Sequence, residues 1–184
     1  MSGRAAHDLG VHVLDQALYL MGRQVQSISA ATYRVRPRGR GYRTGRSNKM
    51  RRQRVRGGDL ASAFIRMTDG STLLLEAGWS VFGDYADDFS ITLYGTEGGA
   101  TMSVKNYGWE DTVRVYTETA GSPSVIIPTL VRGGGHQAVV NKFIEAIRSD
   151  EWSAHVGREG LLRTRVVDAC YTSAREGREM MLAE

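Results

Sequence analysis

Apolar residues recur with a helical spacing near the start of the chain. Four of them stand at i, i+3, i+4 and i+7, so on a helix they form a single stripe that can face a core. They are Leu14, Ala17, Leu18 and Met21. Gly22 follows directly, and glycine commonly ends a helix. The pattern therefore predicts a first helix that stops at Gly22.

The middle of the chain alternates between short β-rich runs and turn signals. Thr68-Asp69-Gly70 and Glu97-Gly98-Gly99 each separate two such runs, as in a hairpin. Short turns between neighbouring runs favour an antiparallel sheet over parallel crossover units. The expected strands are residues 25–33, 60–67, 71–79, 89–96, 100–104, 112–119 and 124–129.

Two more helical stripes follow the last of these runs. The first comprises Val140, Phe143, Ile144 and Ile147, and the second comprises Leu162, Val166, Ala169, Cys170 and Ser173. Gly177 is the expected stop of the last helix, and residues 180–182 are expected to add a short strand. The order of elements predicts an α+β fold, with the helices on one face of an antiparallel sheet.

Composition indicates one globular domain. The chain has 184 residues, and its 41% hydrophobic content can build a core. Its apolar runs are too short to span a bilayer, and no secretory signal is visible at its start. The lone cysteine, Cys170, cannot form an internal disulfide, which fits a reducing, cytoplasmic location. Its place on the last apolar stripe predicts a buried side chain.

The net charge of +4 comes from one segment. Ten arginines and one lysine lie between Arg34 and Arg56 without any acid, so the rest of the chain is acidic overall. The segment has no helical or strand period and contains glycines and a proline, which predicts a long exposed loop over residues 34–58. Tyr33 and Tyr42 could stack on bases, but no nucleic-acid-binding fold signature accompanies them. Nucleic acid is therefore not the favoured partner.

Candidate chemistry gathers in HDLGVHVLD, residues 7–15. On a helix Asp8, His12 and Asp15 stand at i, i+4 and i+7 and share one face. An aspartate one turn from a histidine can orient the ring and favour its protonated form, as a general base requires. A solvated helix start and an incomplete metal site are open alternatives. The metal alternative lacks further ligands, because His136 and His155 have no paired ligand spacing.

The same residues carry a resemblance to a known family. SGRAAHDLGVHVLD, with DLASAFIRMTDGSTLLLEAGW and EGLLRTRVVDACYTSAREGREMML, resembles the C-terminal domain of the Gfo/Idh/MocA oxidoreductases, the family of glucose-fructose oxidoreductase and inositol dehydrogenase. The resemblance runs the full length, and its most specific part is Asp-x-Gly-x-His-x-x-Asp, met by Asp8, Gly10, His12 and Asp15. It implies an open, mostly antiparallel sheet with helices on one face, as a single domain over residues 1–184.

The family implies a role for each of these residues. His12 would be the general base that takes the proton of a substrate hydroxyl, with Asp8 as its partner. Gly10 would allow close approach of backbone or substrate, and Asp15 would face the substrate. His136 is a further substrate-binding candidate, as are the aromatic residues Tyr107 and Trp109. The implied substrate is a sugar, cyclitol or related polyol, and the implied cofactor is NAD or NADP.

The family's cofactor half has no counterpart in this sequence. There is no GxGxxG and no Glu-Lys-Pro motif, and the two glycine-rich stretches, residues 39–45 and 132–137, do not join a strand to a helix within a βαβ unit. Only seven residues precede Asp8, so the chain is expected to begin inside the second domain. The resemblance thus implies a half that binds no cofactor alone, works with a separate Rossmann-domain partner and forms a homo-oligomer through its sheet face.

A second hypothesis differs in class. The chain could be a non-catalytic interaction module that uses its sheet face or its arginine-rich loop to bind a protein or nucleic acid. Its support is the separation of basic and acidic charge along the chain.

Overall fold

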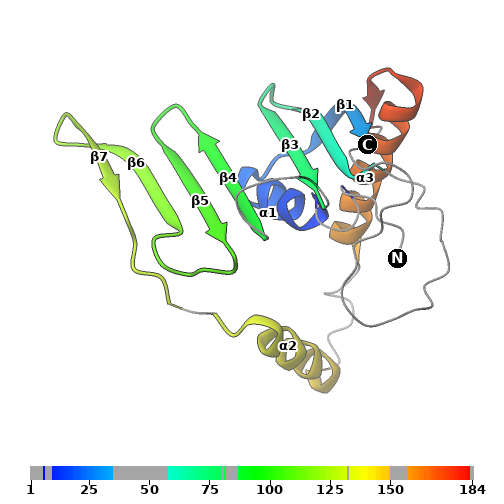
Figure 1. The fold of residues 1–184 in the computed structure, drawn as a ribbon. Helices are drawn as coiled ribbons and strands as arrows, with labels where there is room; N and C mark the ends of the chain where they lie inside the picture. The colour runs from blue at the N-terminus through cyan, green and yellow to red at the C-terminus, as the bar shows by residue number, and fades with distance from the viewer. Residues whose placement is uncertain are drawn as a thin grey trace. The chain divides into compact units, whose positions relative to one another are not determined.

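The computed structural model describes residues 6, 10–34, 58–79, 81, 87–131, 133–149 and 157–182. Figure 1 shows the order of the elements along the chain. They fall into two compact units, unit 1 from Met1–Asp84 with Gly160–Glu184, and unit 2 from Tyr85–Glu159. Each unit holds one four-stranded antiparallel sheet, which confirms the predicted α+β class. That the two units form one domain stays a prediction.

The first helix of unit 1, α1 (Val11–Met21), ends where the sequence predicted. Gly22 adopts the left-handed conformation, with φ 60°, and its N–H donates to the carbonyl oxygen of Leu18 at 3.0 Å. A residue with a side chain adopts this conformation only at a cost, so glycine suits the position. After this helix end, the chain continues into the first strand.

The sheet of unit 1 has the order β3-β2-β1-β8, so the last strand of the chain lies beside the first. Its strands are β1 (Val25–Tyr33), β2 (Leu60–Met67), β3 (Thr72–Gly78) and β8 (Met180–Met181). The predicted Asp-Gly hairpin joins β2 to β3, with Phe64 opposite Leu74. Of the arginine-rich segment, residues 35–57 lie outside the described residues, so its expected loop is not tested.

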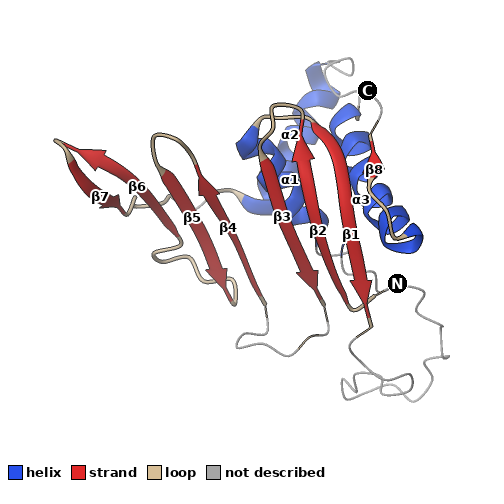
Figure 2. Ribbon diagram, turned by 90° about the horizontal axis from the view of Figure 1, so that it is seen from above, coloured by secondary structure: helices blue, strands red, loops and turns tan. Residues whose placement is uncertain are grey.

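A core lies between this sheet and two helices, α1 and α3 (Arg158–Glu176), which cover one of its faces (Figure 2). Alternate residues of β2 point into it, whereas residues on both helices enter with a helical spacing. The fully or nearly fully buried members include Leu14, Ile28, Ile65, Met67, Val166 and Cys170. Cys170 is therefore the buried side chain that the sequence predicted.

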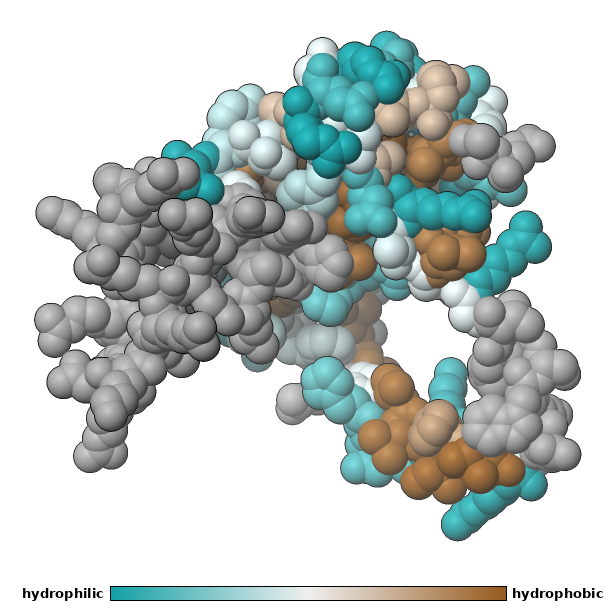
Figure 3. Space-filling model, turned by 90° about the vertical axis from the view of Figure 1, so that its right-hand side faces the viewer, coloured by the Kyte–Doolittle hydropathy of each residue, from teal (hydrophilic) through white to brown (hydrophobic). Residues whose placement is uncertain are grey.

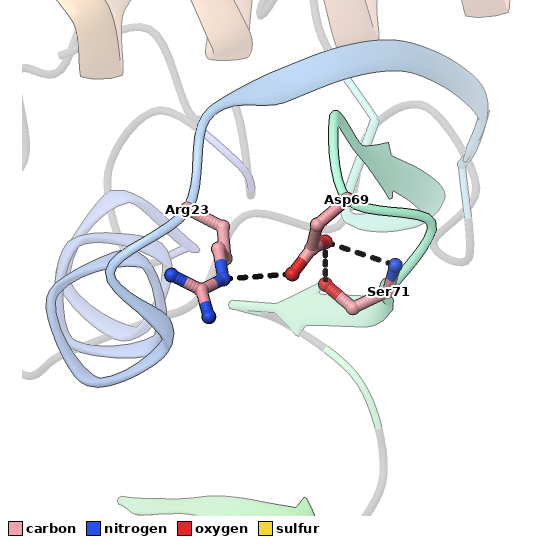
Figure 4. A network of polar contacts seen from close by, with 3 residues as sticks. All are labelled: Arg23, Asp69 and Ser71. Carbon is pink, nitrogen blue, oxygen red and sulfur yellow. Dashed lines mark hydrogen bonds and ion pairs between the residues drawn. The ribbon is translucent and has the colours of Figure 1, made fainter.

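A polar network ties α1 to the hairpin turn at one end of this sheet (Figure 4). Arg23, just after α1, donates from Nε to a carboxylate oxygen of Asp69 at 2.7 Å. The other Asp69 oxygen accepts from the hydroxyl of Ser71 at 2.6 Å and from its backbone N–H at 3.0 Å. These bonds from Ser71, with a smaller contribution from Arg23, hold the pKa of Asp69 below its ordinary value.

Unit 2 is a meander of four antiparallel strands in the order β4-β5-β6-β7. They are β4 (Asp88–Tyr94), β5 (Gly99–Lys105), β6 (Val113–Thr119) and β7 (Ser122–Ile126). The turn between β4 and β5 requires glycine at position 98, because a Cβ there would lie 2.5 Å from the carbonyl oxygen of Tyr116. The second predicted hairpin is thus confirmed.

Helix α2 (Gly135–Ser149) also belongs to unit 2. Its predicted apolar stripe, Val140, Phe143, Ile144 and Ile147, is between 40% and 59% exposed. Figure 3 shows these apolar side chains gathered on the helix at the bottom of the view, where α2 lies in Figure 1. Packing of this stripe against a sheet therefore stays a prediction. None of the described helices combines the length and apolar character that crossing a bilayer requires.

Candidate active site

Helix α1 has one buried face and one polar, exposed face. Leu14, Ala17 and Leu18 enter the core, and the helical period therefore turns a second set of residues outward. That exposed set is His12, Asp15, Gln16 and Tyr19, at i, i+3, i+4 and i+7. We call it the polar face of α1. It brings an imidazole and a carboxylate together one turn apart.

The start of α1 is only partly described. Asp8 lies outside the described residues, so its pairing with His12 stays a prediction. Gly10 is buried and has φ −61° and ψ −31°, which are ordinary helical values. The backbone therefore does not need glycine there for its conformation. Its expected role in close approach to backbone or substrate stays a prediction.

Asp15 has a partner from the far end of the chain. The Nε of Arg163, near the start of α3, donates to Oδ1 of Asp15 at 2.8 Å. Sequence reasoning named Asp15 but missed Arg163, which is 148 residues away. The only signal available was that both residues lie on helices expected to cover the same face of the sheet. The ion pair joins the polar face of α1 to α3.

His136 lies elsewhere in the fold. It is the second residue of α2 in unit 2, where its side chain is exposed. Its predicted substrate contact stays a prediction.

Tyr107 and Trp109 lie on the turn between β5 and β6, also in unit 2. Asn106 and Tyr107 both have positive φ, 49° and 58°. The turn is held by a bond from the N–H of Gly108 to the carbonyl oxygen of Lys105 at 2.8 Å. Both aromatic rings are exposed. The turn thus presents two aromatic side chains to solvent, and their contact with a substrate stays a prediction.

Two surface hollows are lined by residues of unit 2. One runs along α2 and is lined by Asn141, Ile144, Glu145, Arg148 and Ser149. The other lies over the turn between β4 and β5. No group of three or more metal-ligating side chains gathers within the part of the chain that the structure describes. On the polar face of α1, an imidazole can take up a proton and a carboxylate can accept a hydrogen bond.

A dinucleotide cofactor does not fit the described residues. Such cofactors place their pyrophosphate on a glycine-rich turn that joins a parallel strand to a helix N-terminus. Every strand pair in the described sheets is antiparallel, so no βαβ unit is present within them. The glycines before α2 follow β7, which pairs only with β6 among the described strands. These residues offer no pyrophosphate cradle.

Comparison with known families gives a match over nearly the whole chain. The Gfo/Idh/MocA family model described as "Oxidoreductase family, C-terminal alpha/beta domain" matches residues 1–182. No curated protein matches the chain.

Solved structures resemble the chain in fold. An oxidoreductase domain protein from Kribbella flavida has a TM-score of 0.73 at 18% identity, over 98% of this chain and 51% of that one. The WlbA dehydrogenase from Bordetella pertussis, in complex with NADH and UDP-GlcNAcA, has a TM-score of 0.67 at 20% identity, over 99% of this chain and 47% of that one. Aldose-aldose oxidoreductase from Caulobacter crescentus, complexed with glycerol, has a TM-score of 0.65 at 21% identity, over 98% of this chain and 48% of that one. The chain thus spans about half the length of each.

Proposed function

Since the chain belongs to the Gfo/Idh/MocA oxidoreductase family as its C-terminal alpha/beta domain, we propose that it is the substrate-binding half of an NAD(P)-dependent dehydrogenase. The substrate is a sugar, a cyclitol or a related polyol, and the group that is oxidised is one of its hydroxyls. The observation that carries the proposal is the polar face of α1, where His12 and Asp15 stand one turn apart on the exposed side of a helix whose other side is buried.

The chemistry assigned to the chain is proton removal and hydroxyl binding. His12 takes the proton of the hydroxyl that is oxidised, as a positioned imidazole does near neutral pH. Asp8 is its partner one turn earlier on the helix. Asp15 accepts a hydrogen bond from a neighbouring hydroxyl, because an ionised carboxylate offers only acceptors. His136 is kept as a further substrate contact.

The named ligands of similar structures support this substrate class. Glycerol is a polyol, and it is bound in the structure of aldose-aldose oxidoreductase. A levoglucosan dehydrogenase was solved with NADH and L-sorbose, at a TM-score of 0.67 and 21% identity. These proteins share the fold with this chain, and function is carried by a site rather than by a fold. The proposal therefore depends on the residues of α1.

A cofactor-binding half completes the enzyme, in the same polypeptide or in another one. The nicotinamide cofactor that accepts the hydride is held there, because the described residues of this chain offer it no cradle. We also infer that two copies associate through the face of the unit 1 sheet opposite α1 and α3. There Leu74 is 78% exposed beside the half-buried ring of Phe64.

The test uses the chain joined to, or mixed with, a family cofactor-binding half that restores dehydrogenase activity. His12→Ala should lower kcat by about 100-fold or more, as loss of a positioned general base does. Asp8→Asn should lower it by less. Gln137→Ala is the control, because this exposed side chain on α2 bonds only to Asn141 among the described contacts. Unchanged turnover in His12→Ala would contradict the proposal.

The competing proposal of a non-catalytic interaction module keeps one specific support, the basic segment of the sequence. If no cofactor-binding half restores activity, and the chain instead binds a partner through that segment, the module hypothesis replaces the enzymatic one. Simple attraction to phosphates should collapse as salt is added, so binding that persists near about 0.2 M salt would favour it.

A further inference from the structure

The ion pair between Arg163 and Asp15 is asymmetric. The side chain of Arg163 is only 16% exposed, whereas that of Asp15 is 59% exposed. The protein therefore holds the arginine in place, while the carboxylate projects toward solvent. A second arginine–aspartate pair in unit 1 joins Arg23 to Asp69 at 2.7 Å, and its side chains are 57% and 40% exposed. Both of its members are open to water.

The contact uses only part of the carboxylate. Arg163 donates from Nε to Oδ1 at 2.8 Å. A carboxylate has two oxygens with about four acceptor positions, so Oδ2 keeps its capacity to accept from another group. A charge-assisted bond also restricts the rotation of the aspartate side chain, which lowers the entropy lost when a ligand binds. Asp15 is thus presented as a fixed acceptor one turn from His12.

We propose that Arg163 is the positioning residue that fixes Asp15 as the acceptor for a substrate hydroxyl, next to the hydroxyl that His12 deprotonates. The inference rests on the proposed function and adds to it a residue on α3. A polyol presents neighbouring hydroxyls a few ångströms apart, which suits a base and an acceptor set one helical turn apart. Arg163 acts through Asp15 and does not itself touch the substrate.

A purely structural role accounts less well for the pair. The carboxylate of Asp15 is open to water, which screens its charge and limits what the pair contributes to stability. The core of unit 1 already joins α1 to α3 through apolar side chains such as Leu14 and Val166. Arg163 is held in place and bonds to an exposed carboxylate one turn from His12. Its main effect is therefore on the direction of that carboxylate, and its effect on the packing of the helices is smaller.

The first test measures kinetics in the active assembly of this chain with a cofactor-binding half. Arg163→Gln should raise the KM for the polyol by about 10-fold, with kcat changed by less than about 3-fold, as loss of a binding contact does. Asp15→Asn should do the same. The KM of the double variant should be no higher than that of either single variant, because each change breaks the same ion pair. Arg163→Lys should recover part of the loss.

Arg23→Gln is the matched control. It breaks an arginine–aspartate bond of the same kind, also in unit 1, but at the hairpin turn beyond the C-terminal end of α1, whereas His12 is near the start of that helix. Its KM and kcat should equal those of the wild type. If Arg163→Gln fails to fold, Asp15→Asn and Arg163→Lys decide the question, because both keep a hydrogen-bonding side chain in place.

The second test needs no activity and uses the 184-residue chain alone. In a ¹H–¹⁵N spectrum the Nε–H of Arg163 should give a distinct signal that shifts in Asp15→Asn. The ring signals of His12 should move in Arg163→Gln and stay in place in Arg23→Gln. Unmoved His12 signals would overturn the inference.

The outcomes separate the two proposals. If His12→Ala retains full turnover, the proposed function fails, whatever Arg163 does. If His12→Ala loses turnover while Arg163→Gln keeps its KM, or while the effects of Arg163→Gln and Asp15→Asn simply multiply, the inference fails alone.

Discussion

The hydroxyl of Ser173 on α3 accepts a hydrogen bond from the backbone N–H of Ala30 in β1 at 2.9 Å, across 143 residues of sequence. The same hydroxyl donates to the carbonyl oxygen of Arg178 at 2.6 Å. Ser173 is only 2% exposed, so water cannot replace either bond. One side chain therefore joins the last helix, the segment before β8 and the first strand.

Replacing this serine should destabilise unit 1. Ser173→Ala leaves a backbone N–H and a backbone carbonyl without their partner, and each unmet buried group costs about 1–3 kcal/mol. We expect the free energy of unfolding to fall by about 2 kcal/mol or more, measured by urea denaturation. Ser124→Ala is the control, because that hydroxyl bonds to Ser122 on an exposed strand. A loss below about 0.5 kcal/mol in Ser173→Ala would contradict the assignment.

The thiol of Cys170 should make stability depend on pH in the alkaline range. Burial raises the pKa of Cys170 from 9.0 to about 11. As the pH rises, the unfolded chain therefore loses this proton before the folded chain does. The contribution of the thiol to the free energy of unfolding is fully present below pH 9.0 and is lost between pH 9.0 and about 11. The loss should be on the order of 1 kcal/mol per pH unit.

Urea unfolding at pH 8 and pH 10 measures this effect, with Cys170→Ala as the reference that lacks the thiol. The wild type should lose more stability than the variant over this range. The thiol should also resist a thiol reagent at neutral pH until the chain is unfolded, because burial suppresses the reactive thiolate. Equal losses in the two proteins would show that Cys170 titrates as if it were exposed.

The chain alone should not bind a nicotinamide dinucleotide. The described strands pair only antiparallel, and the sequence lacks a GxGxxG turn, so the described residues provide no cradle for the pyrophosphate. Calorimetry with NAD and with NADP should show no saturable binding with a Kd below about 1 mM. Adding a cofactor-binding half should restore it. Tight binding by the chain alone would mean that a site lies beyond the described residues.

Two copies of the chain should associate through the face of the unit 1 sheet that lies opposite α1 and α3. Leu74 projects from this face, opposite Phe64, whose ring also lies 4.8 Å from the guanidinium of Arg66. Leu74→Asn should weaken the dimer by about 10-fold or more, since a central apolar contact commonly contributes over 1 kcal/mol. Light scattering over a concentration series measures this. Val131→Asn, at a side chain that is 91% exposed in unit 2, is the control.

Local patterns predicted the elements well. The stripe through Leu14 and Leu18, the stop at Gly22 and the turn at Asp69 each reflect a spacing or a backbone preference within a few residues. Such signals are carried by neighbours in sequence, so they can be read without the fold. Even the short strand at residues 180–182 was found in this way, as β8.

Contacts between distant segments could not be predicted. Arg163 does not differ by any local pattern from an ordinary polar residue on a helix. Ser173 lies on the predicted apolar stripe, but that stripe does not identify its partner. The partners Asp15 and Ala30 lie 148 and 143 residues away. The candidate site was found from α1 alone, because His12 and Asp15 are close in sequence. The arginine that completes it depends on how α1 and α3 pack.

The order of the strands has a consequence for how the chain is made. Unit 1 combines Met1–Asp84 with Gly160–Glu184, and β1 pairs with β8, which is made only after all of unit 2. Its core also needs α3, so the apolar residues of α1 and β1 stay without their full set of partners until α3 has been made. Unit 2 is continuous and can form its meander while synthesis proceeds. Unit 1, which carries His12, therefore closes after unit 2 can form, and its early segments need protection from aggregation until then.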